Sequence, residues 1–252
     1  DLYMSALLAA FFFMLGAICG SFTGLVAERA FTGQSWKTGR SRCNSCRAYL
    51  SAPDLVPIVS WLVHRGRCRK CGSKVPVLYA LYELALGTLF LGGFLYFGLT
   101  LALALFLITL LPLAFIVIYD LRHTLVPPQA SALFIALAAL FAVMRAPDLH
   151  SLIVTAAFAF GIALFFFLLF ALSRGRAMGL GDTPVSFGLA LMAGHASVAG
   201  LLFSFWIGGV IGILILAFRK GGPRMGIEVP FVPFMAAGFL LALLTQWTPF
   251  PY

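Results

Sequence analysis

Two aspartates stand at the edges of strongly apolar segments, where paired carboxyl groups could do acid–base chemistry. Asp120 ends the apolar run FIVIYD, and Asp182 lies in the glycine-rich stretch MGLGDTPV between two further apolar runs. Two carboxyl groups held close together do not both ionise, so one keeps a proton while the other is charged. Such a pair can activate water with one group and protonate a scissile amide with the other.

Helix capping is the alternative role for these aspartates. Asp182 precedes Thr183 and Pro184, and a proline in the first turn after an aspartate cap is an ordinary helix start. Gly179 and Gly181 would allow a backbone, of this chain or of a substrate, to approach closely. A single G-x-G-D stretch is a weak signal, so the pattern alone leaves both roles open.

Four cysteines have the spacing of a metal site. CNSC holds Cys43 and Cys46, and CRKC holds Cys68 and Cys71, which gives C-x2-C twice with 21 residues between the pairs. Four thiolates in this pattern supply tetrahedral ligands for Zn²⁺. A loop with few apolar side chains needs such a staple in order to fold. We therefore expect structural zinc; a redox-active pair and a rubredoxin-like iron site are the alternatives.

Two glutamates are candidates for binding roles. Glu83 is expected about 10 Å inside an apolar segment, at 1.5 Å per residue, where ionisable groups are costly and are functional candidates. It either binds a substrate amine or is a buried carboxyl group that hydrogen-bonds neighbouring helices. Glu28 either belongs to the same binding site or forms an interfacial ion pair with Arg29.

The composition predicts that membrane helices position these residues. The chain is 62% hydrophobic and 10% charged, with a mean hydropathy of +1.04, whereas about a quarter of the residues of a soluble domain are charged. Apolar runs of about 20 residues favour helices over the strands of a barrel. We expect eight segments, at roughly 4–27, 77–98, 100–119, 129–144, 151–173, 184–194, 197–218 and 229–247.

The resulting fold class is an all-α polytopic membrane protein of about eight transmembrane helices. The expected organisation is a first transmembrane helix at 1–27, a cytoplasmic zinc-binding domain at 28–76 and a transmembrane core at 77–252. The first helix is too long for the core of a signal peptide and is interpreted as retained.

The basic residues predict the orientation. All but one of the 17 Lys and Arg residues fall in alternate loops that share one side of the membrane, and only Arg145 falls on the other. The positive-inside rule makes the rich side cytoplasmic. The net charge of +9 is therefore interpreted as topology and not as nucleic-acid binding. The aspartates Asp120 and Asp182 would both lie at the cytoplasmic edge.

In order and spacing, these motifs resemble the bacterial type IV prepilin peptidases, which are bifunctional leader peptidases and N-methyltransferases. This chain departs from the family pattern at Pro184, where a lysine is usual, and at Thr23-Gly24, where an asparagine usually follows G-S-F. The matching stretches are ICGSFTGLVAERA, the paired C-x2-C loop, YELALGTLF, DLRHTLVP, GLGD and VPFVPFMAAG.

The resemblance implies a specific activity. Asp120 and Asp182 would be the catalytic pair of an aspartic membrane protease in the bacterial inner membrane. It would cut after the glycine that ends the short basic leader of a prepilin or pseudopilin, in type IV pilus or type II secretion systems. The new N-terminus would be methylated from S-adenosylmethionine, which Glu83 could help to position.

Two other function classes remain as alternatives. One is a presenilin-like G-x-G-D protease, against which the cysteine loop and the P-F-x-P-F context argue. The other is a membrane transporter or scaffold with a zinc-stabilised cytoplasmic domain, in which Asp120 and Asp182 would bind an ion or proton. A transporter keeps its acids near the bilayer midplane, whereas these are expected at one edge.

Overall fold

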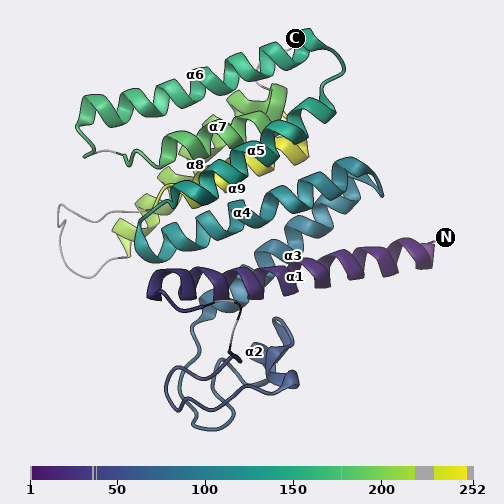
Figure 1. Cartoon of the computed structure of the whole chain (residues 1–252), viewed down its shortest axis with the longest axis vertical. Helices are drawn as coiled ribbons and strands as arrows, with labels where there is room; N and C mark the ends of the chain where they lie inside the picture. Colours follow the sequence, from purple (N-terminus) through teal and green to yellow (C-terminus); the bar gives the residue numbers. More distant parts are fainter. Residues whose placement is uncertain (1, 36, 38, 177, 219–229, 249–252) are drawn as a thin grey trace. The chain divides into compact units, whose positions relative to one another are not determined.

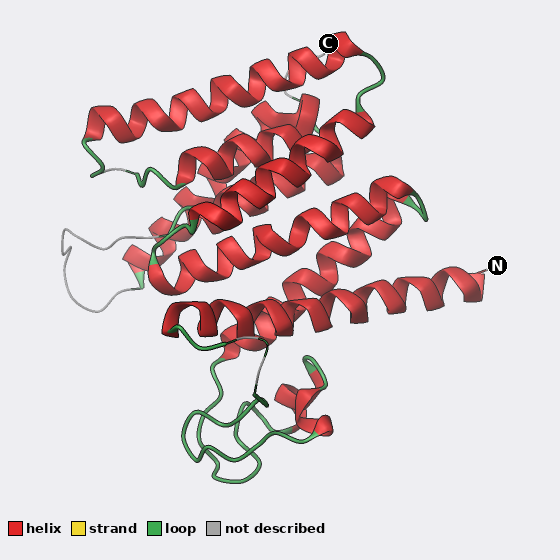
Figure 2. Ribbon diagram, viewed as in Figure 1, coloured by secondary structure: helices red, strands yellow, loops and turns green. Residues whose placement is uncertain are grey.

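The protein is described by a computed structural model that covers residues 2–35, 37, 39–176, 178–218 and 230–248. Figures 1 and 2 show that helices dominate this part of the chain, and no strand is present among these residues. The chain divides into two compact units, residues 1–103 and 104–252. The predicted all-α polytopic fold is confirmed.

The first unit contains two long helices, α1 (Leu2–Thr32) and α3 (Val77–Phe97), joined by a loop with the short helices η1 (Ala52–Leu55) and α2 (Val59–Val63). Glycines bring α1 and α3 together. A Cβ atom on Gly16 would lie 2.5 Å from the carbonyl oxygen of Leu86, and one on Gly20 would lie 2.6 Å from that of Tyr82. Small residues at such crossings let helix backbones pack closely in a membrane.

The second unit is built around α7, whose side chains Val185, Leu189 and Ala190 are fully buried. The helices α5, α6, α8 and α9 all contact α7. The elements of this unit are α4 (Leu101–His123), α5 (Pro128–Arg145), α6 (Leu149–Ser173), α7 (Asp182–Ala193), η2 (Gly194–Ala196), α8 (Ser197–Ala217) and α9 (Val232–Thr245).

Six helical stretches of the described residues are long and apolar enough to cross a membrane. The sixth, Asp182–Ile215, contains α7 and most of α8, which the η2 turn separates, and α9 is a shorter apolar helix. Counted one by one, the apolar helices correspond to the eight predicted segments. Their bounds agree with the prediction to within a few residues, because prolines, glycines and polar residues end the apolar runs.

The end of α1 differs most from the prediction. The helix continues to Thr32 instead of ending at residue 27, because the first residue with a positive φ after it is Gly33, at 67°. Glu28 and Arg29 are therefore helical. Residues 219–229, which include Glu228 and the first residue of the predicted segment 229–247, lie outside the described residues.

Candidate functional site

The two candidate aspartates lie in the second unit, one near the C-terminal end of a helix and the other at the N-terminal end of another helix. Asp120 is in the last turn of α4, and Asp182 is the first residue of α7. Both are buried, with 5% and 7% of their surface exposed, and the charge of Asp182 acts on the carboxyl group of Asp120. The third described carboxylate of this unit, Asp148, is exposed at the start of α6.

The carboxylate of Asp182 is held by the glycine-rich turn before it. Its Oδ2 atom accepts a hydrogen bond of 3.1 Å from the backbone N–H of Gly179, and its own N–H donates to the Gly179 carbonyl oxygen at 3.2 Å. The N-cap position of α7 is occupied by Gly181, so Asp182 is the first helical residue and not the cap. A simple helix cap therefore does not describe its contacts.

Gly181 lies against the loop that follows Asp120. A Cβ atom on Gly181 would lie 2.6 Å from Cβ of Val126, which is closer than real Cβ contacts. A Cβ atom on Gly179 would meet nothing nearer than Asp182 Oδ2, at 3.8 Å. The two glycines therefore differ. Gly181 allows the turn to pack closely against Val126, whereas Gly179 donates its backbone N–H to the carboxylate of Asp182.

The carboxyl group of Asp120 faces the start of α9, because the backbone N–H of Val232 points toward it. Among the described residues, nothing donates a hydrogen bond to its buried Oδ2 atom. The buried hydroxyl oxygen of Thr183, next to Asp182, likewise has no hydrogen-bond partner there. A buried polar atom without a partner is costly, so these two atoms are available to a water molecule or a substrate.

This arrangement can carry out general acid–base chemistry. Two carboxyl groups that share a buried site favour a state with one proton between them. The charged group can take a proton from water while the protonated group gives one to a leaving amine. Val126 and Val232, which touch this site, were missed in the sequence, because only the folded chain brings them to the aspartates.

The four cysteines of the first unit form one cluster. Their sulfur atoms all lie within 4.8 Å of one another, and the Sγ atoms of Cys43 and Cys71 are 3.8 Å apart. The cysteines are not paired as disulfides. This cluster could hold a metal ion, as the paired C-x2-C pattern predicts.

Each C-x2-C pair sits in a turn that an antiparallel bridge closes, Arg42 with Tyr49 and Arg67 with Lys74. Four residues after the first cysteine of each turn, the chain takes a positive φ: 58° at Arg47 and 69° at Gly72. Glycine takes a positive φ readily, so the residue type marks the turn at Gly72. The type of Arg47 gives no such mark for the equivalent turn.

Polar groups around the cluster stabilise thiolates, the form that binds metals. The backbone N–H of Cys46 and then the Ser73 hydroxyl lower the pKa of Cys43 to about 6. The hydroxyl and then the backbone N–H of Ser73 also lower the pKa of Cys71. Cys43 and Cys71 thus favour the thiolate before any metal is bound, whereas hydrogen bonding with the side chain of Cys71 raises the pKa of Cys46 to about 11.

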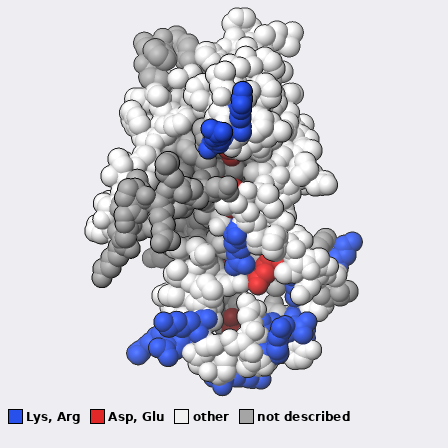
Figure 3. All heavy atoms as spheres, turned by 90° about the vertical axis from the view of Figure 1, so that its left-hand side faces the viewer, with Lys and Arg blue, Asp and Glu red and all other residues white. Residues whose placement is uncertain are grey.

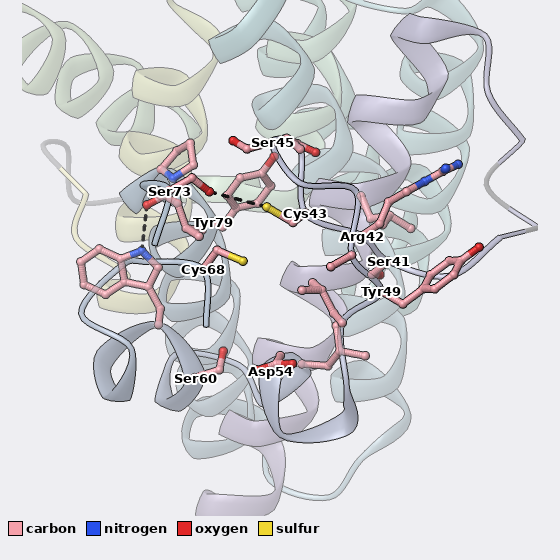
Figure 4. Close-up of a pocket in the computed structure, with 18 of the residues that line it drawn as sticks. Ser41, Arg42, Cys43, Ser45, Tyr49, Asp54, Ser60, Cys68, Ser73 and Tyr79 are labelled. Carbon is pink, nitrogen blue, oxygen red and sulfur yellow. Dashed lines mark hydrogen bonds between the residues drawn. The ribbon is translucent and has the colours of Figure 1, made fainter. Parts of the chain in front are cut away.

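A cavity of about 930 Å³ lies in the first unit, between the cysteine loop and the adjoining ends of α1 and α3. Figure 4 shows several of its lining residues, among them Cys43, Asp54 and Tyr79. The predicted residues Glu28 and Glu83 both line it. Its volume is within the range of ligand pockets, about 300–1,000 Å³.

Both glutamates accept short hydrogen bonds in this unit. Glu28 accepts one of 2.7 Å from the hydroxyl of Tyr79, and Glu83 accepts one of 2.6 Å from the backbone N–H of Ile58. Glu83 therefore ties the loop to α3, a structural role that the sequence left open beside a binding role. Tyr79 and Ile58 carried no signal in the sequence for these contacts.

The chain matches two family models, one in each compact unit. Residues 14–97 match the Bacterial Peptidase A24 N-terminal domain. Residues 105–217 match the Type IV leader peptidase family. The two cysteine pairs lie within the first matched segment, and the two aspartates lie within the second.

Similar curated proteins share one name, prepilin leader peptidase/N-methyltransferase. The protein of that name from Myxococcus xanthus is 35% identical over 229 residues, which cover 88% of this chain and 68% of the relative. The one from Bacillus subtilis is 29% identical over 234 residues and 92% of both chains. The one from Dichelobacter nodosus is 35% identical over 211 residues, 81% of this chain and 70% of the relative. No solved structure gives a significant match.

Proposed function

This chain belongs to the type IV leader peptidase family, and on that premise we propose that it removes the leader from type IV prepilins or pseudopilins by aspartic proteolysis. It then transfers a methyl group to the new N-terminus. The names of its relatives support both activities. The single observation that carries the proteolytic step is the buried pair Asp120 and Asp182 in one compact unit.

In this reaction the ionised aspartate takes a proton from a water molecule, which attacks the carbonyl carbon of the scissile amide. The protonated aspartate then gives its proton to the leaving nitrogen, so the pair ends with its charge unchanged. The N–H groups of Gly179 and Val232 keep the two carboxyl groups in place. The Oδ2 atom of Asp120, which has no hydrogen-bond partner among the described residues, can accept a hydrogen bond from this water.

The substrate is itself a membrane helix with a basic leader. Both aspartates lie at the ends of apolar helices, so the bond is cut at the membrane edge. The distribution of Lys and Arg supports a cytoplasmic position for that edge in the bacterial inner membrane. At that edge the basic leader can be cut on the cytoplasmic side, where the prepilin is synthesised, without crossing the membrane.

The test is leader removal by the purified protein in lipid, with Asp120→Asn and Asp182→Asn. We expect each substitution to slow cleavage by about 10²–10⁴-fold, the usual contribution of a positioned acid or base. The matched control is Asp148→Asn, the same chemical change at the exposed aspartate, whose side chain accepts a 2.8 Å hydrogen bond from the Ser151 N–H. Asparagine caps helices about as well as aspartate, so this substitution should leave the start of α6 intact.

Cleavage that survives either of the first two substitutions would refute the dyad. Loss of cleavage in Asp148→Asn would show that the assay reports folding and not catalysis.

We assign the cysteine cluster to Zn²⁺ with a structural role. In a tetrahedron with Zn–S bonds of about 2.3 Å the sulfur atoms are about 3.8 Å apart, and the Cys43–Cys71 distance of 3.8 Å has this value. All four positions would be filled by Cys43, Cys46, Cys68 and Cys71, which leaves none for a substrate. Such a closed site stabilises the fold and does no chemistry of its own.

We assign the cavity of the first unit to S-adenosylmethionine, which when bound supplies the methyl group. The cavity is large enough, and the carboxylates of Glu28 and Glu83 can attract the positive charges of that cofactor or of the pilin amine. Arg29 and Arg42, which also line it, can pair with a carboxylate. These residues bind and orient the reactants, whereas the proteolytic step uses the second unit.

A further inference from the structure

The short helix α2 presents an apolar surface that no described part of the protein covers. Val56, three residues before α2, is 38% exposed, and Val59, Leu62 and Val63 within it are 50%, 60% and 68% exposed. We call these four side chains the α2 patch. Exposed apolar side chains that gather in this way usually mark a surface that binds something.

The two faces of α2 differ. Ser60, Trp61 and His64 line the cavity of the first unit, whereas no residue of the α2 patch does so. One face of the helix is therefore occupied by the cavity, and the patch is on the other. An amphipathic helix of this kind needs a second apolar environment for its outer face.

Hydrogen bonds hold α2 beside the beginning of a membrane-spanning helix. Glu83 of α3 accepts the 2.6 Å bond from Ile58, the residue just before α2, and Trp61 of α2 donates a 3.2 Å bond to the carbonyl oxygen of Val75. Glu83 is six residues, or about 9 Å, past the start of α3 at Val77. The patch therefore lies beside the first two turns of a helix that crosses the bilayer.

At the same level, α3 itself presents leucines outward. Leu78, Leu81 and Leu84 are all exposed, as side chains that face lipid should be. The 21 residues of α3 extend about 31 Å, which matches the hydrocarbon thickness of about 30 Å. The first turns of α3 therefore lie at the border of the acyl chains and so does α2.

The backbone before α2 is fixed in a way that supports this position. Ile58 has φ 61° and ψ −51°, and the N–H of Val59 bonds the carbonyl oxygen of Pro57 at 2.5 Å, which is a classic γ-turn. A β-branched residue rarely takes this conformation. The Glu83 carboxylate accepts the hydrogen bond from the N–H of Ile58, and this bond holds the turn against α3.

Positive charge follows the patch along the chain. Arg65, Arg67, Arg69 and Lys70 are all exposed; the last three also line the rim of the cavity, whereas Arg65 does not. In Figure 3, Lys and Arg side chains gather over the lower part of the molecule, where Figure 1 places the loop between α1 and α3. An apolar face next to cationic side chains fits the acyl chains and phosphate groups of a lipid surface.

We propose that α2 is an interfacial membrane anchor, which inserts Val56, Val59, Leu62 and Val63 into the acyl border of the lipid leaflet while the cations after it bind lipid phosphates. The loop between α1 and α3 is thus attached to the membrane surface through α2 and is not surrounded by water on all sides. This places the floor of the cavity at the membrane surface, where the N-terminus of a membrane helix would be found.

Fluorescence quenching by lipids tests this anchor. Leu62→Trp and, as the matched control, Tyr49→Trp place a new indole at two exposed positions of the same loop, one in the patch and one outside it. The full-length variants are reconstituted in vesicles of phosphatidylcholine and phosphatidylglycerol, with and without bromine atoms near the upper end of the acyl chains. Emission of the unsubstituted protein is subtracted.

We expect bromolipid to quench most of the added emission of Leu62→Trp and little of that of Tyr49→Trp. Acrylamide, a quencher dissolved in the water, should quench Tyr49→Trp strongly and Leu62→Trp weakly. Equal quenching of both variants by acrylamide would overturn the proposal. So would a Leu62→Trp signal that neither agent quenches, because protein, such as a second copy of the chain, would then cover the patch.

Discussion

At the scale of single residues, the two glycines before Asp182 have different physical tasks. Gly181 is packed against Val126, so Gly181→Ala forces a methyl group into an occupied space at a cost of about 1–3 kcal/mol. The turn must move, and Asp182 with it; a shift of about 1 Å can slow a reaction by about 10²-fold. We expect a clear loss of prepilin cleavage and a lower melting temperature for this variant.

The control is Gly179→Ala, whose new methyl group has free space and whose backbone N–H still reaches Asp182. It should retain most of the cleavage activity. The double variant Gly181→Ala with Val126→Gly should recover part of what Gly181→Ala loses, because it removes the Cβ and Cγ atoms of Val126 with which the new methyl group clashes. Equal damage from both single substitutions would show that backbone flexibility, and not packing against Val126, is what the glycines provide.

At the scale of elements, the cysteine turns should depend on metal for their fold. Structural zinc contributes about 10–16 kcal/mol of binding free energy in small zinc-finger peptides, and the described loop between α1 and α3 has little buried apolar surface of its own. We expect Cys43→Ser to lower the bound zinc and to make residues 33–76 sensitive to trypsin. Metal analysis and limited proteolysis measure these two effects.

Cys19→Ser is the matched control, because Cys19 lies within α1 and not in the cluster. It should keep a full complement of zinc and an intact loop. If Cys43→Ser also keeps its zinc, the four cysteines are not the ligands.

The sequence predicted those elements that have a strong local signal. Apolar runs define the long helices, and the C-x2-C pairs define the cysteine cluster. It did not predict α2, because five residues are too few to show a helical period and the γ-turn at Ile58 has no glycine to mark it. Nor did it predict that α1 continues through Glu28 and Arg29, since charged residues end an apolar run without ending a helix.

At the scale of the whole molecule, the sequence predicted the family but not the contacts that complete each site. Asp120 and Val232 are far apart in the chain, as are Gly181 and Val126. Contacts of this kind arise from tertiary packing and leave no periodic trace in a single sequence. The side of the membrane that carries the aspartates remains a prediction from the Lys and Arg distribution.

The division of the chain into two units predicts that its two proposed reactions can be separated. The aspartate pair belongs to residues 104–252, whereas the cavity with Glu28 and Glu83 belongs to residues 1–103. Asp120→Asn should therefore still methylate a pilin whose leader has already been removed. Glu83→Gln should cleave a prepilin normally but transfer methyl groups about tenfold more slowly or worse, because hydrogen bonds to charged groups contribute about 1.5–3 kcal/mol.

Glutamine is the informative replacement, because its carbonyl oxygen can still accept the hydrogen bond from Ile58 while the negative charge is lost. A defect in Glu83→Gln thus reports the charge and not the anchoring of α2. Both reactions are followed on one pilin, cleavage by gel mobility and methylation by label from S-adenosylmethionine. If Asp120→Asn failed on the pre-cut pilin, or Glu83→Gln lost cleavage as well, the two units would share one site.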